Sequence, residues 1–179
     1  MTALLPLGLW VPILDGDDAA RILFERHYSA AASLRLRQER GTRLFAGPGW
    51  KLVLSTPCRR ALFVWRKFRP MNDQEGINCA IFRNESPLLS SRLIRAADAI
   101  ADAYWPGEWH YTYVSAAKTA SRRSRHSPPG ACFIHAGWRL LPEVTKKRGL
   151  AILERTAPIR SLPSERSSTL SRGGEEPNQ

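Results

Sequence analysis

The segment Pro129–Arg139 reads PGACFIHAGWR, and residues 140–154 continue it as LLPEVTKKRGLAILE. Apolar residues up to Ala136 predict a short helix that packs against a core through side chains such as Phe133. Gly137 predicts the end of this helix, because glycine adopts the left-handed conformation of a helix C-terminus at little cost. An aromatic-started strand, a charged turn and a final strand follow. The segment therefore predicts a helix that leads into a closing hairpin.

The rest of the chain alternates between apolar, β-branched runs and segments with apolar residues at helical spacing. The runs predict strands and the spaced residues predict helices. We expect strands at 9–14, 51–55, 61–66, 77–82 and 109–114, and helices from 19 to about 28 and from 87 to about 104. This order favours an α/β fold, in which helices cover both faces of a mixed, mostly antiparallel central sheet.

Length and composition predict a single domain, which we place at residues 1–155. The chain has 179 residues, of which 43% are hydrophobic, and this is enough for an ordinary core. Residues 156–179 are rich in Ser, Pro, Gly and Arg, so we expect a disordered tail. The tail contains three arginines and three glutamates, so the whole net charge of +11 belongs to the domain. Such an excess favours a polyanionic partner, nucleic acid first and cofactor phosphates second.

The three cysteines, Cys58, Cys79 and Cys132, are widely spaced, and the sequence has no Cys-x-x-Cys pair. This pattern indicates neither a zinc site nor a disulfide framework, so we expect reduced thiols and a cytoplasmic protein. The apolar start at residues 1–14 contains two prolines, lacks a basic region and is too short to span a bilayer. We therefore expect no membrane partner.

Cations are concentrated in one region of the chain. Residues 35–69 contain ten Lys and Arg residues, and their one acidic residue is Glu39. Trp50 and Trp65 lie in the same region and could stack on bases. This combination is typical of contact with a phosphate backbone, so we expect double-stranded DNA as a partner. A solvated basic surface with core tryptophans is the alternative. The residues expected to contact DNA are Arg35, Arg37, Arg40, Arg43, Lys118, Arg122, Arg123 and Arg125.

The junction between the strand at 77–82 and the helix after it is a candidate phosphate site. The first turn of a helix leaves backbone amides free and carries partial positive charge, so it binds phosphate well. Arg83 would add a forked cation at the end of the strand. Ser86 and Ser90 are both candidate N-caps of the helix. An ion pair between Arg83 and Glu85 at the rim of the sheet is the structural alternative.

His27 lies at the end of the first expected helix and is a candidate for proton transfer or metal binding near neutral pH. A histidine on an amphipathic helix also serves as a cap or a packing residue, and this alternative stays open. Tyr111 and Tyr113 share one face of the strand at 109–114, because side chains alternate along a strand. Either tyrosine could line a reaction cleft or fill the core.

Together these pieces resemble the GNAT acyltransferase superfamily, and within it the Mom-like DNA-modification proteins of phages and prophages. The resemblance covers about residues 9–155. Ser86 and Leu88 stand where the cofactor-binding pattern of the superfamily has glycines. The matching pieces are His27-Tyr28-Ser29, Phe63-Val64-Trp65-Arg66, NCAIFRNE at 78–85, YTYV at 111–114 and the segment that begins at Pro129.

The resemblance implies a transferase that converts the N6 amine of adenine in DNA to a carbamoylmethyl form, which shields phage DNA from restriction. It implies an acyl-CoA or related donor, and iron as a metal that His27 could hold. The adenine would have to flip out of the duplex into a pocket. The residues implied on the cofactor side are Arg83, Asn84, Glu85, Ser90 and Ser91, and the candidates at the reaction site are His27, Tyr28, Tyr111 and Tyr113.

Two other functions stay open at this point. One is a conventional N-acetyltransferase that uses acetyl-CoA on a small amine or a protein amine. The other is a basic nucleic-acid-binding protein without catalytic activity on the same scaffold, which the two missing glycines favour. The sequence leaves the oligomeric state open.

Overall fold

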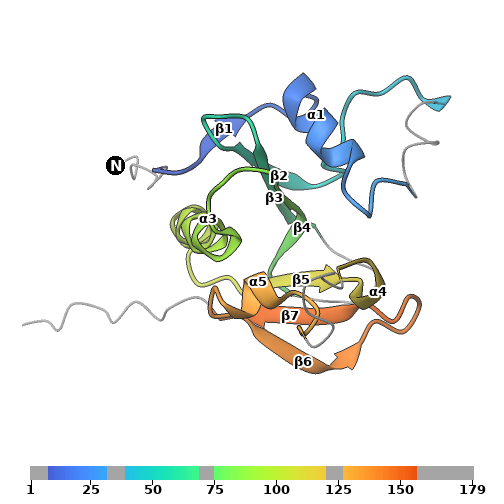
Figure 1. Ribbon diagram of the computed structural model, residues 1–179, viewed down its shortest axis with the longest axis vertical. Helices are drawn as coiled ribbons and strands as arrows, with labels where there is room; N and C mark the ends of the chain where they lie inside the picture. Colours follow the sequence, from blue (N-terminus) through green and yellow to red (C-terminus); the bar gives the residue numbers. More distant parts are fainter. Residues whose placement is uncertain (1–7, 32–38, 69–74, 120–126, 157–179) are drawn as a thin grey trace, which may run out of the picture.

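A seven-stranded sheet organises the protein (Figure 1). A computed structural model describes residues 8–31, 39–68, 75–119 and 127–156. The strand order is β1-β2-β3-β4-β5-β7-β6, and every neighbouring pair is antiparallel except β4 and β5, which run parallel. The expected mixed, mostly antiparallel sheet is therefore confirmed. The strands are β1 (Val11–Ile13), β2 (Trp50–Ser55), β3 (Ala61–Lys67), β4 (Ile77–Asn84), β5 (His110–Val114), β6 (Arg139–Val144) and β7 (Ala151–Arg155).

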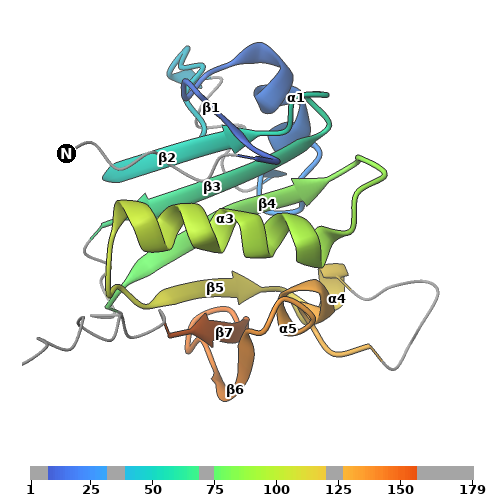
Figure 2. The ribbon, with the colours of Figure 1, turned by 90° about the vertical axis from the view of Figure 1, so that its left-hand side faces the viewer.

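Helices cover both faces of this sheet, as the sequence predicts. Helix α1 (Asp18–Glu25) packs on one face, against β3 and β4, and helix α3 (Ser90–Tyr104) packs on the other (Figures 1 and 2). The short helices α4 (Ala116–Thr119) and α5 (Ala131–Ile134) follow β5, and α5 contacts α3. Within the described part of the chain, no helix is long and apolar enough to cross a membrane.

Strand β3 lies in the centre of the core and explains why its sequence is a continuous apolar run. All of its first five residues are buried. Phe63 and Trp65 pack with α3, whereas Leu62 and Val64 pack with α1. A strand covered on both faces needs apolar side chains at every position rather than at alternate ones. The two core clusters are therefore separated by the sheet itself.

The closing segment folds as its sequence predicts. Helix α5 ends before Gly137, which has a φ of 100°, and the amide of Trp138 donates to the carbonyl of Phe133 at 3.0 Å. This arrangement is the glycine-terminated helix end expected from the sequence. The hairpin of β6 and β7 follows, with β6 at one edge of the sheet and a register shift between Leu140 and Val144.

The predicted N-caps of the second long helix are wrong. Helix α3 begins at Ser90, so Ser90 is its first residue, and the N-cap position is Leu89, which makes no side-chain cap bond. The hydroxyl of Ser86 instead donates to the side-chain oxygen of Asn84 at 2.6 Å. The amide group of Asn84 in turn donates to the carbonyl of Leu88 at 2.7 Å. A side-chain-stabilised turn therefore uses the hydroxyl that the sequence assigns to the cap.

The parallel strands β4 and β5 separate after a short contact. They pair only at Ile77, Asn78 and Cys79, which face His110, Tyr111 and Thr112 in that order. Strand β4 then continues to Asn84, while β5 ends at Val114. At the closed end the amide of Ile77 donates to the carbonyl of Trp109 at 2.6 Å. The sheet is thus continuous at one end of this pair and open at the other.

Candidate functional site

A cavity of about 230 Å³ lies where β4 and β5 diverge. The segment after α1, both strands and helix α5 supply its walls. Tyr113, which the sequence offers as a residue of a reaction cleft, is among the residues that line this cavity. Its lining residues are His27, Tyr28, Cys79, Ala80, Phe82, Thr112, Tyr113, Val114, Thr119, Ser127, Pro128, Gly130, Ala131, Cys132 and Phe133.

His27 follows the end of α1 and lines the cavity. Its Nδ1 atom accepts a hydrogen bond from the amide of Ser29 at 3.3 Å and lies 2.8 Å from the Ser29 hydroxyl. Because an amide nitrogen can only donate, Nδ1 carries no proton, and the neutral ring holds its proton on Nε2. Burial, and then the positive charge of Arg83, lower the pKa of His27 to about 4. The side chain is therefore a neutral N–H donor at pH 7.

The pKa of His27 predicts how stability changes with acidity. An unfolded histidine takes up a proton near pH 6.5, whereas His27 in the folded protein does so near pH 4. The unfolded state therefore binds more protons between these values, and the free energy of unfolding should fall as the pH drops from 6.5 to 4. Ring chemical shifts measured by NMR should give a pKa near 4. Substitution His27→Gln should remove this part of the pH dependence of urea unfolding.

Tyr28 connects the segment after α1 to the end of β5. Its hydroxyl donates to the carbonyl of Tyr113 at 3.3 Å, and its ring lies 4.4 Å from that of His27. Burial raises the pKa of Tyr28, so the phenol is neutral at pH 7. His27 and Tyr28, which the sequence assigns to the reaction site, therefore stand side by side at the cavity.

Two cysteines that the sequence analysis does not assign to the site also line this cavity. Cys79 is buried at the last paired position of β4, and the hydroxyl of Thr112 donates to its carbonyl at 2.9 Å. Cys132 is half-buried in α5. Burial raises the pKa of both thiols. Both are therefore protonated and weakly nucleophilic at neutral pH.

Arg83 is already engaged by protein groups. Its Nε donates to Glu85 at 2.7 Å, and its Nη1 donates to the carbonyl of Arg26 at 2.5 Å. Arg26 binds the other oxygen of Glu85 at 2.8 Å. These two arginines, chiefly Arg83, lower the pKa of Glu85. The ion pair at the sheet rim, one of the sequence alternatives, is therefore present.

The other residues assigned to the cofactor side surround the start of α3. Ser90 and Ser91 form its first turn, and the amide group of Asn84 donates to the Ser90 hydroxyl at 3.1 Å. Because Leu89 makes no side-chain cap bond, the first amides of α3 receive no side-chain oxygen from that position. The turn after β4 thus leads into the free amides of α3, but none of the five residues assigned to the cofactor side is among those that line the cavity.

Tyr111 and Tyr113 lie on one face of β5, with ring centroids 5.5 Å apart, as the alternation predicts. Tyr113 lines the cavity, whereas Tyr111 is not among the lining residues. Tyr111 is 1% exposed, and burial raises the pKa of its hydroxyl to about 12. The structure therefore brings Tyr113 to the cavity together with His27 and Tyr28, and places Tyr111 in the core.

The cations assigned to DNA are only partly described. Arg40, Arg43 and Lys118 are exposed, and Arg43 forms an ion pair with Asp18. Lys118 belongs to α4, next to the cavity residue Thr119. The other assigned residues, Arg35, Arg37, Arg122, Arg123 and Arg125, lie outside the residues that the structure describes.

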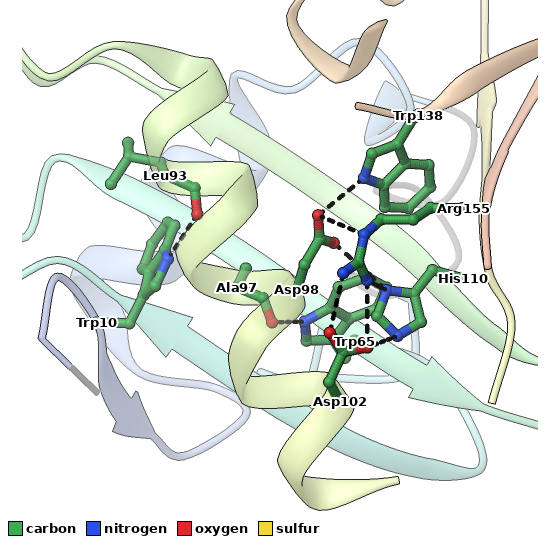
Figure 3. Close-up of polar contacts among 9 residues, drawn as sticks. All are labelled: Trp10, Trp65, Leu93, Ala97, Asp98, Asp102, His110, Trp138 and Arg155. Atoms are coloured by element: carbon green, nitrogen blue, oxygen red, sulfur yellow. Dashed lines mark hydrogen bonds and ion pairs between the residues drawn. The ribbon is translucent and has the colours of Figure 1, made fainter. Parts of the chain in front are cut away.

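A buried charged cluster that the sequence does not predict lies between helix α3 and the sheet (Figure 3). His110 is fully buried between Asp98 and Asp102 of α3, with its Nδ1 3.4 Å from Asp98 and its Nε2 3.3 Å from Asp102. Arg155 of β7 makes a two-pronged contact with Asp102, at 2.9 and 3.1 Å. The indole of Trp138 donates to Asp98 at 3.0 Å.

His27 is the residue that the resemblance implies as a ligand of iron. Across the described ranges, no group of three or more His, Cys, Asp or Glu side chains could hold a metal ion. The cavity lining contains one histidine and two cysteines, His27, Cys79 and Cys132, and they do not form such a group. The described residues therefore do not fit an iron site, and the mechanism proposed below uses none.

Comparison of the chain with models of protein families, with curated proteins and with solved structures found no match in any of the three.

Proposed function

We propose that the protein is a GNAT-type transferase that modifies the N6 amine of adenine in DNA. The observation that carries the proposal is the cavity between the diverging strands β4 and β5, with His27 and Tyr28 at its wall. The superfamily that the sequence resembles places its cofactor and acceptor in such an opening. The parallel strands β4 and β5 are connected through α3, and the antiparallel hairpin of β6 and β7 closes the sheet. This order of elements supports the same proposal.

The start of α3 would hold the pyrophosphate of an acyl-CoA or related donor. Amides in its first turn, at Ser90 and Ser91, suit phosphate oxygens because the helix dipole is positive there. Arg83 would join them only by exchanging its contact with Glu85 for a phosphate. The bound donor supplies an electrophilic carbon and a leaving group.

His27 and Tyr28 would act on the reacting groups. In the transfer the adenine nitrogen forms a bond to the donor carbon, the bond from that carbon to the leaving group breaks, and the amine loses a proton. The Nε2–H of His27 would stabilise negative charge on a carbonyl oxygen of the transferred group. The neutral hydroxyl of Tyr28 would give its proton to the leaving group, and the phenolate left behind would take up the proton that the amine loses.

Exposed cations gather at the same end of the sheet as the cavity and support a DNA substrate. Strands β2, β4 and β5 all end there, and β7 begins there, because it is antiparallel to β5 (Figure 2). The turns therefore lie at the same end of the sheet as the cavity, and phosphates could bind them while a flipped base enters the cavity. The exposed cations of these turns and of α4 are Arg59, which pairs with Asp17, and Arg60, Lys118, Lys146, Lys147 and Arg148.

The proposal is tested by mass spectrometry of nucleosides from DNA of cells that express the protein. We expect a modified deoxyadenosine that is absent from cells without the protein and from cells with His27→Ala. Unmodified DNA at normal expression of folded protein would contradict the proposal. Calorimetry with acetyl-CoA, and with Arg83→Ala, tests the acetyltransferase alternative: binding without any DNA product would favour it.

Binding to DNA gives a separate prediction. Affinity for a short duplex should fall steeply with salt, and Lys147→Ala should make the slope of log K against log salt less steep by about 0.9, because one phosphate contact is lost. Fluorescence anisotropy measures both. Arg95→Ala is the control, because it removes one exposed positive charge from helix α3 and not from these turns. Equal effects of the two variants would contradict this docking surface.

A second candidate is a nucleic-acid-binding protein without transfer activity. The contact of Arg83 with Glu85 favours it, because this carboxylate occupies the guanidinium that a donor pyrophosphate would need. This candidate predicts full DNA binding, no modified nucleoside and no effect of His27→Ala on either measurement.

A further inference from the structure

The sheet consists of two parts that share little backbone pairing. Strands β1 to β4 form one part, and β5, β7 and β6 form the other (Figure 1). The parts join only where Ile77, Asn78 and Cys79 of β4 meet β5. By contrast, β2 and β3 pair along six positions. So short a junction leaves the angle between the parts dependent on other contacts.

Helix α3 contacts the first part through backbone carbonyls. The indole of Trp10, which precedes β1, donates to the carbonyl of Leu93 at 2.9 Å. The indole of Trp65 in β3 donates to the carbonyl of Ala97 at 3.1 Å. Both tryptophans are buried, and both bonds fix the helix over this half of the sheet (Figure 3).

The same helix contacts the second part through two carboxylates. Asp98 accepts from Trp138, which precedes β6, and Asp102 binds both terminal nitrogens of Arg155 in β7. His110 of β5 lies between the two carboxylates. Burial alone would lower the pKa of Arg155, but Asp102 and Asp98 raise it, so the guanidinium remains charged. Each strand of the second part, or the residue just before it, therefore reaches α3.

We propose that Asp98, Asp102, His110, Trp138 and Arg155, here called the α3 clamp, hold the second part of the sheet at a fixed angle to the first and so set the width of the cavity. Ion pairs and indole bonds are directional, and a two-pronged contact fixes orientation as well as distance. Loosening the clamp opens the β4–β5 junction locally, because few backbone bonds oppose the movement. This positioning role holds whatever the cavity binds.

Native cysteines supply the readout. Cys79 is buried at the last paired position of the junction, whereas Cys58 is exposed in the turn between β2 and β3. Labelling with a maleimide, followed by peptide mass spectrometry, gives the rate at each thiol in one sample. In Asp102→Asn the rate at Cys79 should rise at least tenfold over the unmodified sequence, while Cys58 should not change.

The dependence of the Cys79 labelling rate on urea concentration distinguishes local opening from global unfolding. Local opening exposes little surface, so the rate at Cys79 in Asp102→Asn should change little with urea below the unfolding transition. Leu23→Ala, on the opposite face of the sheet, is the matched destabilised control. In Leu23→Ala, Cys79 should react only through global unfolding, so its labelling rate should depend steeply on urea concentration.

Arg155→Lys keeps the positive charge but loses the two-pronged contact with Asp102. The labelling rate at Cys79 should therefore rise less in Arg155→Lys than in Arg155→Met. If Asp102→Asn does not fold, these two variants carry the test. An unchanged rate at Cys79 in folded clamp variants, or a urea dependence as steep as that of Leu23→Ala, would overturn the proposal.

Discussion

Replacing His27 with alanine should reduce the rate of group transfer to DNA by about 10²- to 10³-fold, which is the usual cost of removing one donor to a developing oxyanion. The reason is the tautomer: Ser29 fixes the unprotonated Nδ1, so the ring presents Nε2–H. The rate of appearance of modified deoxyadenosine in a single-turnover assay measures the effect. The salt dependence of DNA binding should not change.

His135→Ala is the control for this experiment, because His135 is exposed at the end of α5 and does not line the cavity. The control should keep the full rate. A loss of rate in His135→Ala, or a full rate in His27→Ala, would show that the catalytic assignment is wrong. Circular dichroism checks that both variants are folded.

The second large effect concerns stability. Replacing Asp98 with alanine should lower the free energy of unfolding by about 3–5 kcal/mol, the usual cost of leaving buried partners of a charge unpaired. Asp98 is 2% exposed, and its loss leaves the Trp138 indole and part of the charge on Arg155 without an acceptor. Urea unfolding followed by tryptophan fluorescence at pH 7 measures the difference.

Asp18→Ala is the matched carboxylate deletion, because Asp18 pairs with Arg43 at the surface. It should cost no more than about 1 kcal/mol, since exposed ion pairs contribute little. Similar losses in the two variants would mean that the buried cluster has no special importance for stability. A loss confined to Asp98→Ala would support its place in the core.

Local rules suffice for most of the fold. Apolar runs predict β2, β3, β4 and β5 to within a few residues, and Gly137 predicts the end of α5. The start of α3 is missed because the oxygen of Ser86 accepts from the amide of Leu88 in a turn that Asn84 stabilises, and the helix begins only after that turn, at Ser90. A cap can be predicted from neighbouring residue types, but whether the residues after it continue as a helix or as a turn depends on the conformation that the backbone adopts.

The sequence likewise points to some residues of the candidate site and misses others. The sequence points to His27 and Tyr28 because their residue types suit proton transfer, and the structure places both at the cavity, while their role in a reaction stays a prediction. The α3 clamp joins residues up to 57 positions apart in sequence, and no local pattern links Asp98 to Arg155. The one available signal is that Asp98 and Asp102 stand one helical turn apart, beside small residues of the buried face.

The two outer strands of the sheet have a consequence for how the protein behaves among its own copies. Strand β1 is three residues long and has Pro12 at its centre, and β6 contains Pro142 beside its register shift. Proline lacks an amide hydrogen, so neither border offers a regular row of donors to an incoming chain. Strand addition and fibrous aggregation are therefore disfavoured at both borders, even though the interior of the sheet is strongly apolar.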